Sequence, residues 1–306
     1  MAEALSPSGE QIELRAGDQR VVVVGVGAGI RSYEVAGEPV FDGYPADAMC
    51  DGARGQHLVP WPNRVRDGRW SWNGRDLQLA LTEPDQHNAI HGLVRWLGWS
   101  VVDRADDAVT LTCTSWPQPG YPWPFDVSVS HHLGDSGLTV TTSVINRGPS
   151  PAPVAAGHHP YLSAGTPLID DCSLHVPAET YLPTGEQQIP TGRAAVASSP
   201  YDFRTPRRVG DTQIDNTYTD LVRDERGRCA VELSAPTGRA VSLWVGPDYD
   251  YVEIFTGDSL PDPARRRRGL GVEPMTAPPN ALATGESLIV LGPEERWSGE
   301  WGIQPR

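Results

Sequence analysis

The sequence predicts an all-β fold in which antiparallel strands pack as a sandwich of sheets. The 306 residues include 32 glycines and 29 prolines, a content typical of short strands joined by tight turns. Short runs of β-branched and apolar residues follow one another at regular spacing, and none has the periodicity of an amphipathic helix of three turns or more. The composition does not break along the chain, so we expect a single domain over residues 1–306.

Two strand pairs are expected in the N-terminal part of the chain. The first predicted strands are residues 11–14 and 20–26. Asn73-Gly74 then indicates a two-residue hairpin, because both turn positions require positive φ, and the strands flanking it are residues 69–72 and 75–81. A short helical turn is expected near residues 84–88.

Alternation of apolar and polar residues is clearest in the middle of the chain. It predicts strands at residues 108–114, 125–132 and 137–146, because successive residues of a strand point to opposite faces. Later runs of the same kind are residues 229–234, 240–245, 251–255 and 287–291. The remaining long segments are expected to be loops, and long loops on a rigid β scaffold usually carry function: residues 45–67, 117–124, 180–219 and 257–280.

Charge and cysteine usage exclude several classes of partner. The formal net charge is −14 at pH 7, and an acidic surface repels nucleic acids and anionic lipids. The cysteines are far apart with no C-x-x-C pair, so we expect reduced thiols and no metal site: Cys50, Cys113, Cys172 and Cys229. No 18-residue apolar run is present, and the N-terminal residues do not have the pattern of a signal peptide. The expected localisation is cytoplasmic.

A glycine-rich segment, Gly25 to Gly29, follows a valine-rich strand and has the spacing G-x-G-x-G. Dinucleotide binding needs a helix after such a loop, whereas residues 30–40 have the pattern of strands. This favours a glycine-rich β-turn, and no cofactor is expected.

Four short segments carry the candidate chemistry. A proline-stiffened loop, residues 59–69, delivers Asn63 and Arg64 just before the hairpin. His91 lies in residues 88–93, and the segment 157–162 reads Gly-His-His-Pro-Tyr-Leu. The fourth segment, residues 269–275, places Glu273 among apolar residues and glycines, where a carboxyl group tends to have a raised pKa that suits a general base.

These segments, in this order, resemble the landmarks of the aldose 1-epimerase family, the galactose mutarotases. The resemblance extends from about Gly29 to Trp297, and the detail Val-Pro-Trp-Pro-Asn-Arg is similar to a bacterial subgroup distinct from the galactose enzymes. It implies a galactose-mutarotase-like antiparallel β-sandwich, or supersandwich, and a small-molecule sugar as substrate. Monomer and homodimer are both compatible with it.

The resemblance also implies roles for individual residues. His159 would be the general acid that protonates the ring oxygen, and Glu273 the base that takes the proton of the C1 hydroxyl. His158 should point the other way, because it is adjacent in a strand. The implied substrate contacts are Arg64, His91 and Asp215, to which the landmark loops add Asn63, Tyr161 and Trp61, whose indole has an apolar face of the kind that packs on a pyranose.

The chemistry implied is the interconversion of α and β anomers. One proton must leave the C1 hydroxyl and another must reach the ring oxygen, and a carboxylate and a histidine can exchange these roles without a metal or cofactor. A non-catalytic sugar-binding or sensing protein on the same fold is the alternative, although such a protein has little need of both groups. A glycosidase would need two carboxylates flanking one bond.

A tract of four arginines, Arg265 to Arg268, precedes Glu273. A solvated loop is one interpretation. The other is recognition of an anionic sugar, phosphorylated or sulfonated, since guanidinium groups match such anions.

Overall fold

The computed structural model describes residues 5–306. Residues 1–4 lie outside the described residues. They belong to the N-terminal segment that, by its sequence, does not have the pattern of a signal peptide. Over the described range the chain forms 27 strands, one short α-helix and four 3₁₀ turns, and the predicted all-β class is confirmed. Among the helices of residues 5–306, none is long and apolar enough to cross a membrane.

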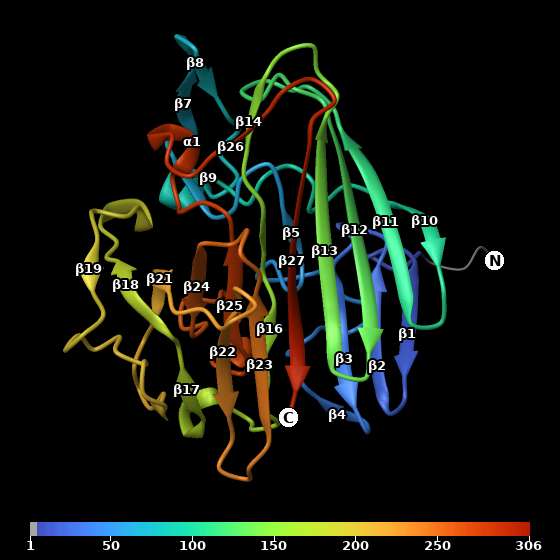
Figure 1. Cartoon of the computed structure of the whole chain (residues 1–306), viewed down its shortest axis with the longest axis vertical. Coiled ribbons are helices and arrows are strands. Elements are labelled where there is room, and N and C mark those ends of the chain that lie inside the picture. The colour runs from blue at the N-terminus through green and yellow to red at the C-terminus, as the bar shows by residue number, and fades with distance from the viewer. Residues whose placement is uncertain (1–4) are drawn as a thin grey trace.

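The largest sheet has nine strands in the order β10-β11-β12-β13-β27-β23-β22-β17-β20. Its long central strands lie side by side in Figure 1. The bounds are β10 (Ser100–Arg104), β11 (Ala108–Ser115), β12 (Phe125–Gly134), β13 (Gly137–Asn146), β27 (Arg296–Pro305), β23 (Ala240–Val245), β22 (Cys229–Ser234), β17 (Ser173–His175) and β20 (Arg207–Arg208).

A second, eight-stranded sheet has the order β19-β18-β21-β24-β25-β15-β5, with β16 also paired to β25. The bounds are β19 (Ala194–Ala195), β18 (Ala178–Leu182), β21 (Asp215–Leu221), β24 (Tyr251–Phe255), β25 (Leu270–Met275), β15 (Gly157–His158), β5 (His57–Leu58) and β16 (Tyr161–Leu162). This sheet carries most of the candidate site.

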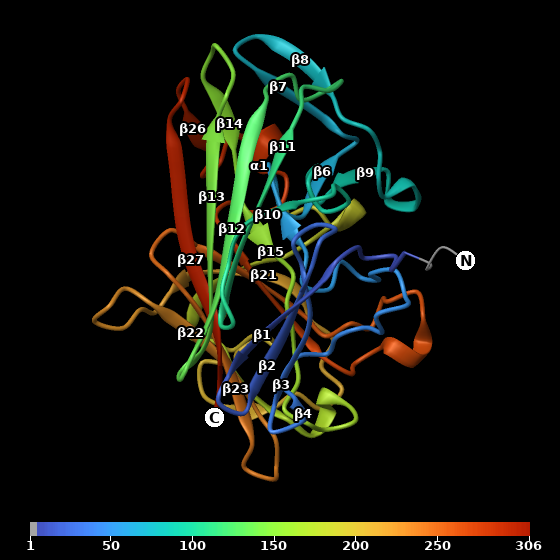
Figure 2. The same ribbon diagram turned by 90° about the vertical axis from the view of Figure 1, so that its right-hand side faces the viewer.

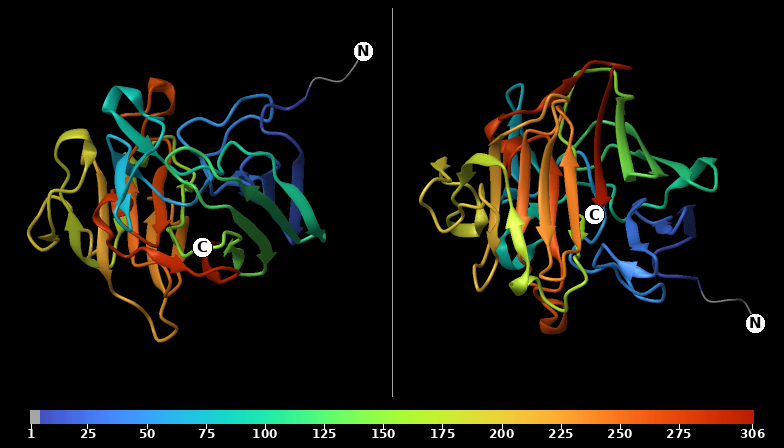
Figure 3. Two further views of the ribbon diagram at one scale, coloured as in Figure 1. Left: turned by 90° about the horizontal axis from the view of Figure 1, so that it is seen from above. Right: turned by 60° about the horizontal axis from the view of Figure 1, so that its bottom comes forward.

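Smaller elements complete the chain. A four-stranded N-terminal sheet has the order β1-β2-β3-β4, and it lies at the opposite end of the molecule from β18 and β19 (Figure 3). The hairpin β7–β8 projects from one end (Figure 2). The bounds are β1 (Gln11–Ala16), β2 (Gln19–Val24), β3 (Ile30–Val35), β4 (Glu38–Pro39), β6 (Arg64–Arg66), β7 (Arg69–Trp72), β8 (Arg75–Gln78), β9 (Asn88–Ile90), β14 (Ala152–Val154), β26 (Ile289–Leu291), α1 (Ala281–Thr284), η1 (Pro84–Gln86), η2 (Ile169–Asp171), η3 (Glu186–Gln188) and η4 (Pro263–Arg265).

The hydrophobic core joins the two large sheets. Strand β11 alternates between half-buried and buried residues along its whole length, so one face of the nine-stranded sheet is covered and the other meets solvent. Ile254 of β24 and Val272 of β25 belong to the same buried cluster as Leu243 of β23 and Trp301 of β27. One face of the eight-stranded sheet is therefore packed against the core, which leaves its other face for the candidate site.

Residues 180–219 and 257–280 were expected to be loops, and this prediction was wrong because both segments contain strands. The first contains β19, β20 and most of β21, and the second contains β25, whose six residues are all buried. Glycine and proline in the second segment suggest a loop, yet a Cβ on Gly271 would lie 3.0 Å from the Cβ of Phe255 on the neighbouring strand. The glycine thus permits close packing within a sheet.

Candidate active site

Three neighbouring strands present a row of polar side chains on one face of the eight-stranded sheet. In the register of β21, β24 and β25, Thr217 lies opposite Glu253, and Glu253 lies opposite Glu273. Asp215 is two residues before Thr217 and shares its face, because strand residues alternate. Strand pairing alone therefore brings together residues from positions 215 to 273 of the chain.

His159 and Glu273 meet directly. Nε2 of the histidine lies 3.1 Å from Oε1 of the carboxyl group, and the two side chains are only 7% and 3% exposed. Burial, followed by the charge of Arg54, lowers the pKa of His159 to about 3. Burial also raises the pKa of Glu273 well above its ordinary value, and the charges of Glu253 and Asp215 add to this effect. Between the two shifted pKa values the pair therefore holds one proton, which these surroundings favour on Glu273 over His159.

Tyr161 holds the imidazole of His159 in place. The two rings stack with centroids 5.0 Å apart and an angle of 14° between their planes. The phenol hydroxyl donates to the carbonyl of Gly52 at 2.9 Å. The guanidinium of Arg54 also contacts the phenol ring, 4.4 Å from its centroid. His158 points to the opposite side, as expected, where it meets the hydroxyl of Tyr249 at 2.8 Å.

Asn63 fixes the positions of two further candidates. Its backbone has a φ of 52°, in the left-handed region that asparagine tolerates better than most residues. Its side-chain oxygen accepts the backbone N–H of Arg64 at 2.8 Å, and its carbonyl accepts the backbone N–H of His91 at 3.0 Å. The imidazole of His91 lies edge-on to that of His159, with centroids 5.3 Å apart.

Arg64 supplies the positive charge of the site. Its Nε lies 2.9 Å from Oε2 of Glu83, and its Nη2 donates to Oε1 of the same carboxylate at 3.0 Å. Burial lowers the pKa of Arg64, but the hydrogen bond to Glu83 and the charges of Asp215 and Glu253 outweigh it, so the pKa is raised. Arg64 stays protonated beside a group of carboxyls.

Three buried polar atoms of the candidate residues have no hydrogen-bond partner among the described residues. They are Oε2 of Glu273, Nδ1 of His159 and Nδ1 of His91. Buried polar atoms normally have a hydrogen-bond partner, so a cluster of unpaired ones is typical of a site for a polar ligand. Across residues 5–306, no group of three or more histidine, cysteine, aspartate or glutamate side chains is arranged to hold a metal ion.

Three tryptophans of the fold occupy different surroundings, and one of them, Trp61, is the predicted sugar contact. Trp61 is 3% exposed and packs in the hydrophobic core, with its ring centroid 6.0 Å from that of Tyr121. Its role as a sugar contact stays a prediction. Trp123 belongs to the same core, whereas Trp96 is 47% exposed.

Glu253 and Glu83 were missed from the sequence. Glu253 is 3% exposed, and its signal is a single acidic residue in the apolar run Tyr251 to Phe255. Glu83 precedes the short turn η1 and has the pattern of an ordinary loop residue. Only the strand register and the fold reveal that both carboxyls face Arg64.

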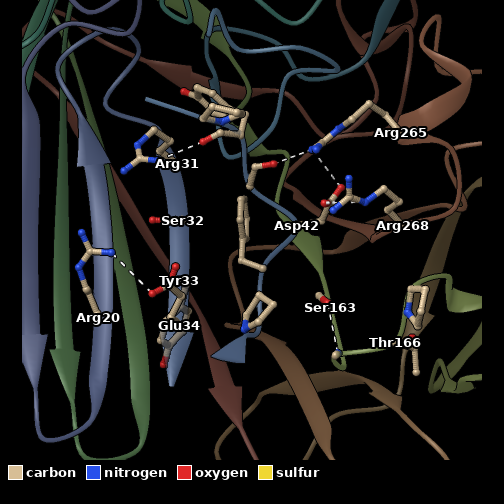
Figure 4. A pocket seen from close by; sticks show the side chains of 17 residues that line it. Arg20, Arg31, Ser32, Tyr33, Glu34, Asp42, Ser163, Thr166, Arg265 and Arg268 are labelled. Carbon is tan, nitrogen blue, oxygen red and sulfur yellow. Dashed lines mark hydrogen bonds and ion pairs between the residues drawn. The ribbon is translucent and has the colours of Figure 1, made fainter. Parts of the chain in front are cut away.

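Two cavities differ in their relation to these residues. One of about 320 Å³ is lined by Asp215 together with Phe255, Asp258 and Gln188. Another, of about 730 Å³, lies between β3 and the arginine tract, and its lining includes none of the candidate site residues (Figure 4). Of these two cavities, only the smaller one is lined by a candidate site residue, Asp215.

Most of the arginine tract is used within the protein. Arg265 donates to the carbonyl of Gly43 at 2.6 Å, and Arg266 donates to the carbonyl of Leu260 at 2.8 Å. Arg267 lies 2.7 Å from a carboxylate oxygen of Asp170 and 2.8 Å from one of Asp258, and its side chain is 14% exposed. Arg268 is 50% exposed and comes no closer than 3.9 Å to Asp42, beside the larger cavity (Figure 4).

Known proteins share both the sequence pattern and the fold. The sequence model of the aldose 1-epimerase family matches residues 10–304. The uncharacterized protein YihR of Escherichia coli strain K12 is 30% identical over 285 residues, which cover 93% of this chain and 89% of YihR. Human galactose mutarotase is 26% identical over 68% of this chain and 63% of its own length. A solved GalM/aldose epimerase homologue from C. elegans is 14% identical, with a TM-score of 0.86 over 97% of this chain and 98% of that one. The landmark segments, the polar face of the β21–β24–β25 strands and these matches agree, and the chain belongs to the aldose 1-epimerase family.

Proposed function

We propose that this protein is an aldose 1-epimerase that interconverts the α and β anomers of an aldose by opening and closing the sugar ring. The observation that carries the proposal is the direct contact of His159 with Glu273, 3.1 Å apart and nearly inaccessible to water. Each partner has a second polar atom, Nδ1 or Oε2, that is buried without a partner among the described residues. The family match supports the same reaction class.

Ring opening moves two protons. The surroundings favour the shared proton on Glu273, so the reaction begins when this proton passes to His159 across their contact. Glu273, as carboxylate, then takes the proton of the C1 hydroxyl, the C1–ring oxygen bond breaks to give the aldehyde, and His159, as imidazolium, gives a proton to the leaving ring oxygen. The pair then consists of a carboxylic acid and a neutral imidazole, which is the other arrangement of the same shared proton. After rotation about C1–C2, the ring closes with the two roles reversed, and both groups return to their starting states.

The remaining candidates are proposed to bind the sugar. Asp215 borders the 320 Å³ cavity, and the charge of Arg64 lowers its pKa against the larger effect of burial. We assign sugar hydroxyl contacts to these two residues and to His91, and a positioning role to Asn63 and Tyr161. His91 has a pKa lowered well below its ordinary value by burial and then by His159, so it meets the sugar as a neutral imidazole.

The test is exchange between anomers of freshly dissolved α-glucose and α-galactose, followed by NMR or polarimetry. Wild type is compared with His159→Ala and Glu273→Ala, and with Glu232→Gln on β22 of the nine-stranded sheet as control. Loss of one acid–base group should lower the rate by about 10²–10⁴-fold, while the control keeps the wild-type rate.

Phosphorylated and sulfonated aldoses are assayed in parallel, because the half-exposed guanidinium of Arg268 could bind the anionic group of such a substrate. If wild type accelerates none of these sugars but binds one of them, the protein is a sugar-binding member of the family. Retention of the full rate in either alanine variant would remove that residue from the acid–base pair.

A further inference from the structure

Gln188 lines the same cavity as Asp215, although the two residues come from different parts of the chain. This cavity, of about 320 Å³, is also lined by Phe255, which lies opposite Asp215 in the register of β21 and β24. The acid–base pair, His159 and Glu273, is not part of the lining. The cavity therefore belongs to the part of the site that receives the sugar away from its reacting C1.

The side-chain oxygen of Gln188 is buried and has no hydrogen-bond partner within residues 5–306. Buried amide oxygens normally accept a hydrogen bond, so an unpaired one beside a cavity is typical of a site for a polar ligand. A sugar hydroxyl is a fitting partner, because it can donate to the amide oxygen and can also accept from the amide N–H group.

The loop that carries Gln188 has a strained backbone. Gln187 and Gln188 have φ values of 58° and 54°, and they are the only two consecutive non-glycine residues with positive φ in the described range 5–306. Residues with a long side chain seldom adopt this conformation, and it persists only where the surrounding structure fixes it. The N–H of Gly185 donates to the carbonyl of Ile189 at 2.9 Å and closes the loop around the two glutamines.

A chain of hydrogen bonds ties this loop to the charged part of the site. Nδ2 of Asn88, a fully buried side chain, donates to the carbonyl of Gln187 at 3.0 Å and to Oε2 of Glu83 at 2.9 Å. The same carboxylate of Glu83 is paired with Arg64. The loop, and Gln188 with it, is therefore held in a fixed position relative to Arg64.

We propose that Gln188 is a specificity-determining residue whose amide hydrogen-bonds an aldose hydroxyl away from C1. Asp215 on β21 and Gln188 on the loop after β18 then bind the hydroxyls of the sugar from two separate elements. The inference rests on the proposed epimerase function, because its ligand is the sugar on which the acid–base pair acts.

Anomer exchange of deoxy aldoses tests this contact. The series contains the aldose that wild type turns over fastest and derivatives of it that each lack one hydroxyl other than that at C1. Gln188→Ala should raise KM for the parent aldose about 3–10-fold with little change in kcat, because the contact is made equally in the ground state and the transition state. For the derivative that lacks the contacted hydroxyl, wild type and Gln188→Ala should have the same KM. An equal KM ratio for the parent and all derivatives would overturn the proposal.

A second variant and a control on the same loop complete the comparison. Asparagine tolerates positive φ and keeps the amide, but its side chain is one methylene shorter, so Gln188→Asn should also raise KM for the parent aldose. Glu186→Ala is the matched control, because Glu186 is exposed on η3 and does not line the cavity. Its KM should equal that of wild type, and urea unfolding shows that each variant is folded. A wild-type KM in both Gln188 variants would show that the amide does not contact the sugar.

Failure of the epimerase function can be told apart from failure of this contact. If wild type binds an aldose without exchanging its anomers, calorimetric titration replaces KM by Kd for the same sugars. A loss of affinity in Gln188→Ala that is confined to sugars with the contacted hydroxyl would then uphold the contact and reject the epimerase function alone. A wild-type protein that neither exchanges nor binds any of these aldoses would overturn both.

Discussion

At the scale of single residues, the acid–base pair has an unusual pH range. Burial lowers the pKa of His159 to about 3 and raises that of Glu273, so the shared proton is present between these two values. It is lost as the pH rises through the raised pKa of Glu273, and a second proton enters only near pH 3. We therefore expect kcat/KM to show no acidic limb near pH 6.5 and to fall on the alkaline side, as the pH rises through the raised pKa of Glu273.

The measurement is a pH–rate profile of anomer exchange, with circular dichroism at each pH to show that the protein is folded. A histidine with an ordinary pKa would instead produce an acidic limb near pH 6.5. Such a limb in folded protein would show that His159 is not held neutral by its surroundings.

Tyr161 makes two separable contributions at this scale, its ring on His159 and its hydroxyl on Gly52. Tyr161→Phe keeps the ring and should retain most of the turnover, with about 1 kcal/mol less stability from the lost hydrogen bond. Tyr161→Ala removes the ring and should lose turnover together with about 3–5 kcal/mol of stability. Urea unfolding and anomer exchange measure the two effects. If Tyr161→Phe lost as much activity as His159→Ala, the hydroxyl would belong to the chemistry.

Short motifs in the sequence single out candidate site residues more readily than the residues that surround them. His159, Glu273 and His91 stand in short segments that resemble family landmarks, and the fold brings them together. Glu253 could not be recognised in this way, because its importance comes from lying opposite Glu273 in strands separated by the 257–269 segment. Pairing register is a property of the folded sheet and leaves little trace in either strand.

At the scale of elements, strands with local alternation were predicted closely. The strands expected at residues 137–146, 229–234, 240–245 and 251–255 match the observed bounds. Strands without alternation were missed, as β25 shows: its residues are buried on both faces, and its glycine and proline are typical of loops. A central strand of this kind is stabilised by partners far away in sequence, so its own residues carry no periodic signal.

The arginine tract supplies a prediction at the same scale. Arg267 ties the segment before β25 to Asp170 and Asp258, and it also donates to the carbonyl of Gly210 at 2.7 Å. Arg267→Ala removes the guanidinium from Asp170, from Asp258 and from the carbonyl of Gly210, and it should cost about 2–4 kcal/mol of stability. Arg268→Ala, at an exposed side chain, should change stability by less than about 0.5 kcal/mol.

Chemical denaturation of both variants measures the difference, and anomer exchange of a neutral aldose should be unaffected in Arg268→Ala. If Arg268→Ala instead weakened turnover of a phosphorylated or sulfonated aldose alone, this guanidinium would bind the anion.

At the scale of the whole molecule, histidines lie between the sheets as well as in the site. Nε2 of His57 donates to the carbonyl of Ala28 at 2.9 Å, which leaves its Nδ1 to accept from Nδ1 of His158 at 2.7 Å. Nε2 of His158 then accepts from the hydroxyl of Tyr249. This chain of hydrogen bonds is complete only when both imidazoles are neutral, because a protonated ring has no acceptor.

Acid should therefore destabilise the fold well above the range where carboxylates protonate. Burial lowers the pKa of His57 to about 4, so between pH 6.5 and 4 the unfolded chain binds a proton that the folded chain does not. The free energy of unfolding therefore decreases as the pH is lowered through this range. Over that range His57 alone removes about 3 kcal/mol. Burial lowers the pKa of the other core and site histidines in the same direction: His91, His131, His158 and His159. The raised pKa values of Asp215, Glu253 and Glu273 act oppositely, but they are fewer.

His131 isolates this effect, because it is fully buried and neither ring nitrogen has a partner among the described residues. His131→Leu removes a titrating group without breaking a hydrogen bond. It should be at least as stable as wild type at pH 7, and between pH 6.5 and 5 its stability should fall less steeply, by up to about 1.4 kcal/mol per pH unit. Urea unfolding at several pH values measures the slope, with the exposed neighbour His132→Gln as control. Equal slopes in wild type and His131→Leu would mean that His131 is protonated in the folded protein, and the acid sensitivity would then have to arise elsewhere.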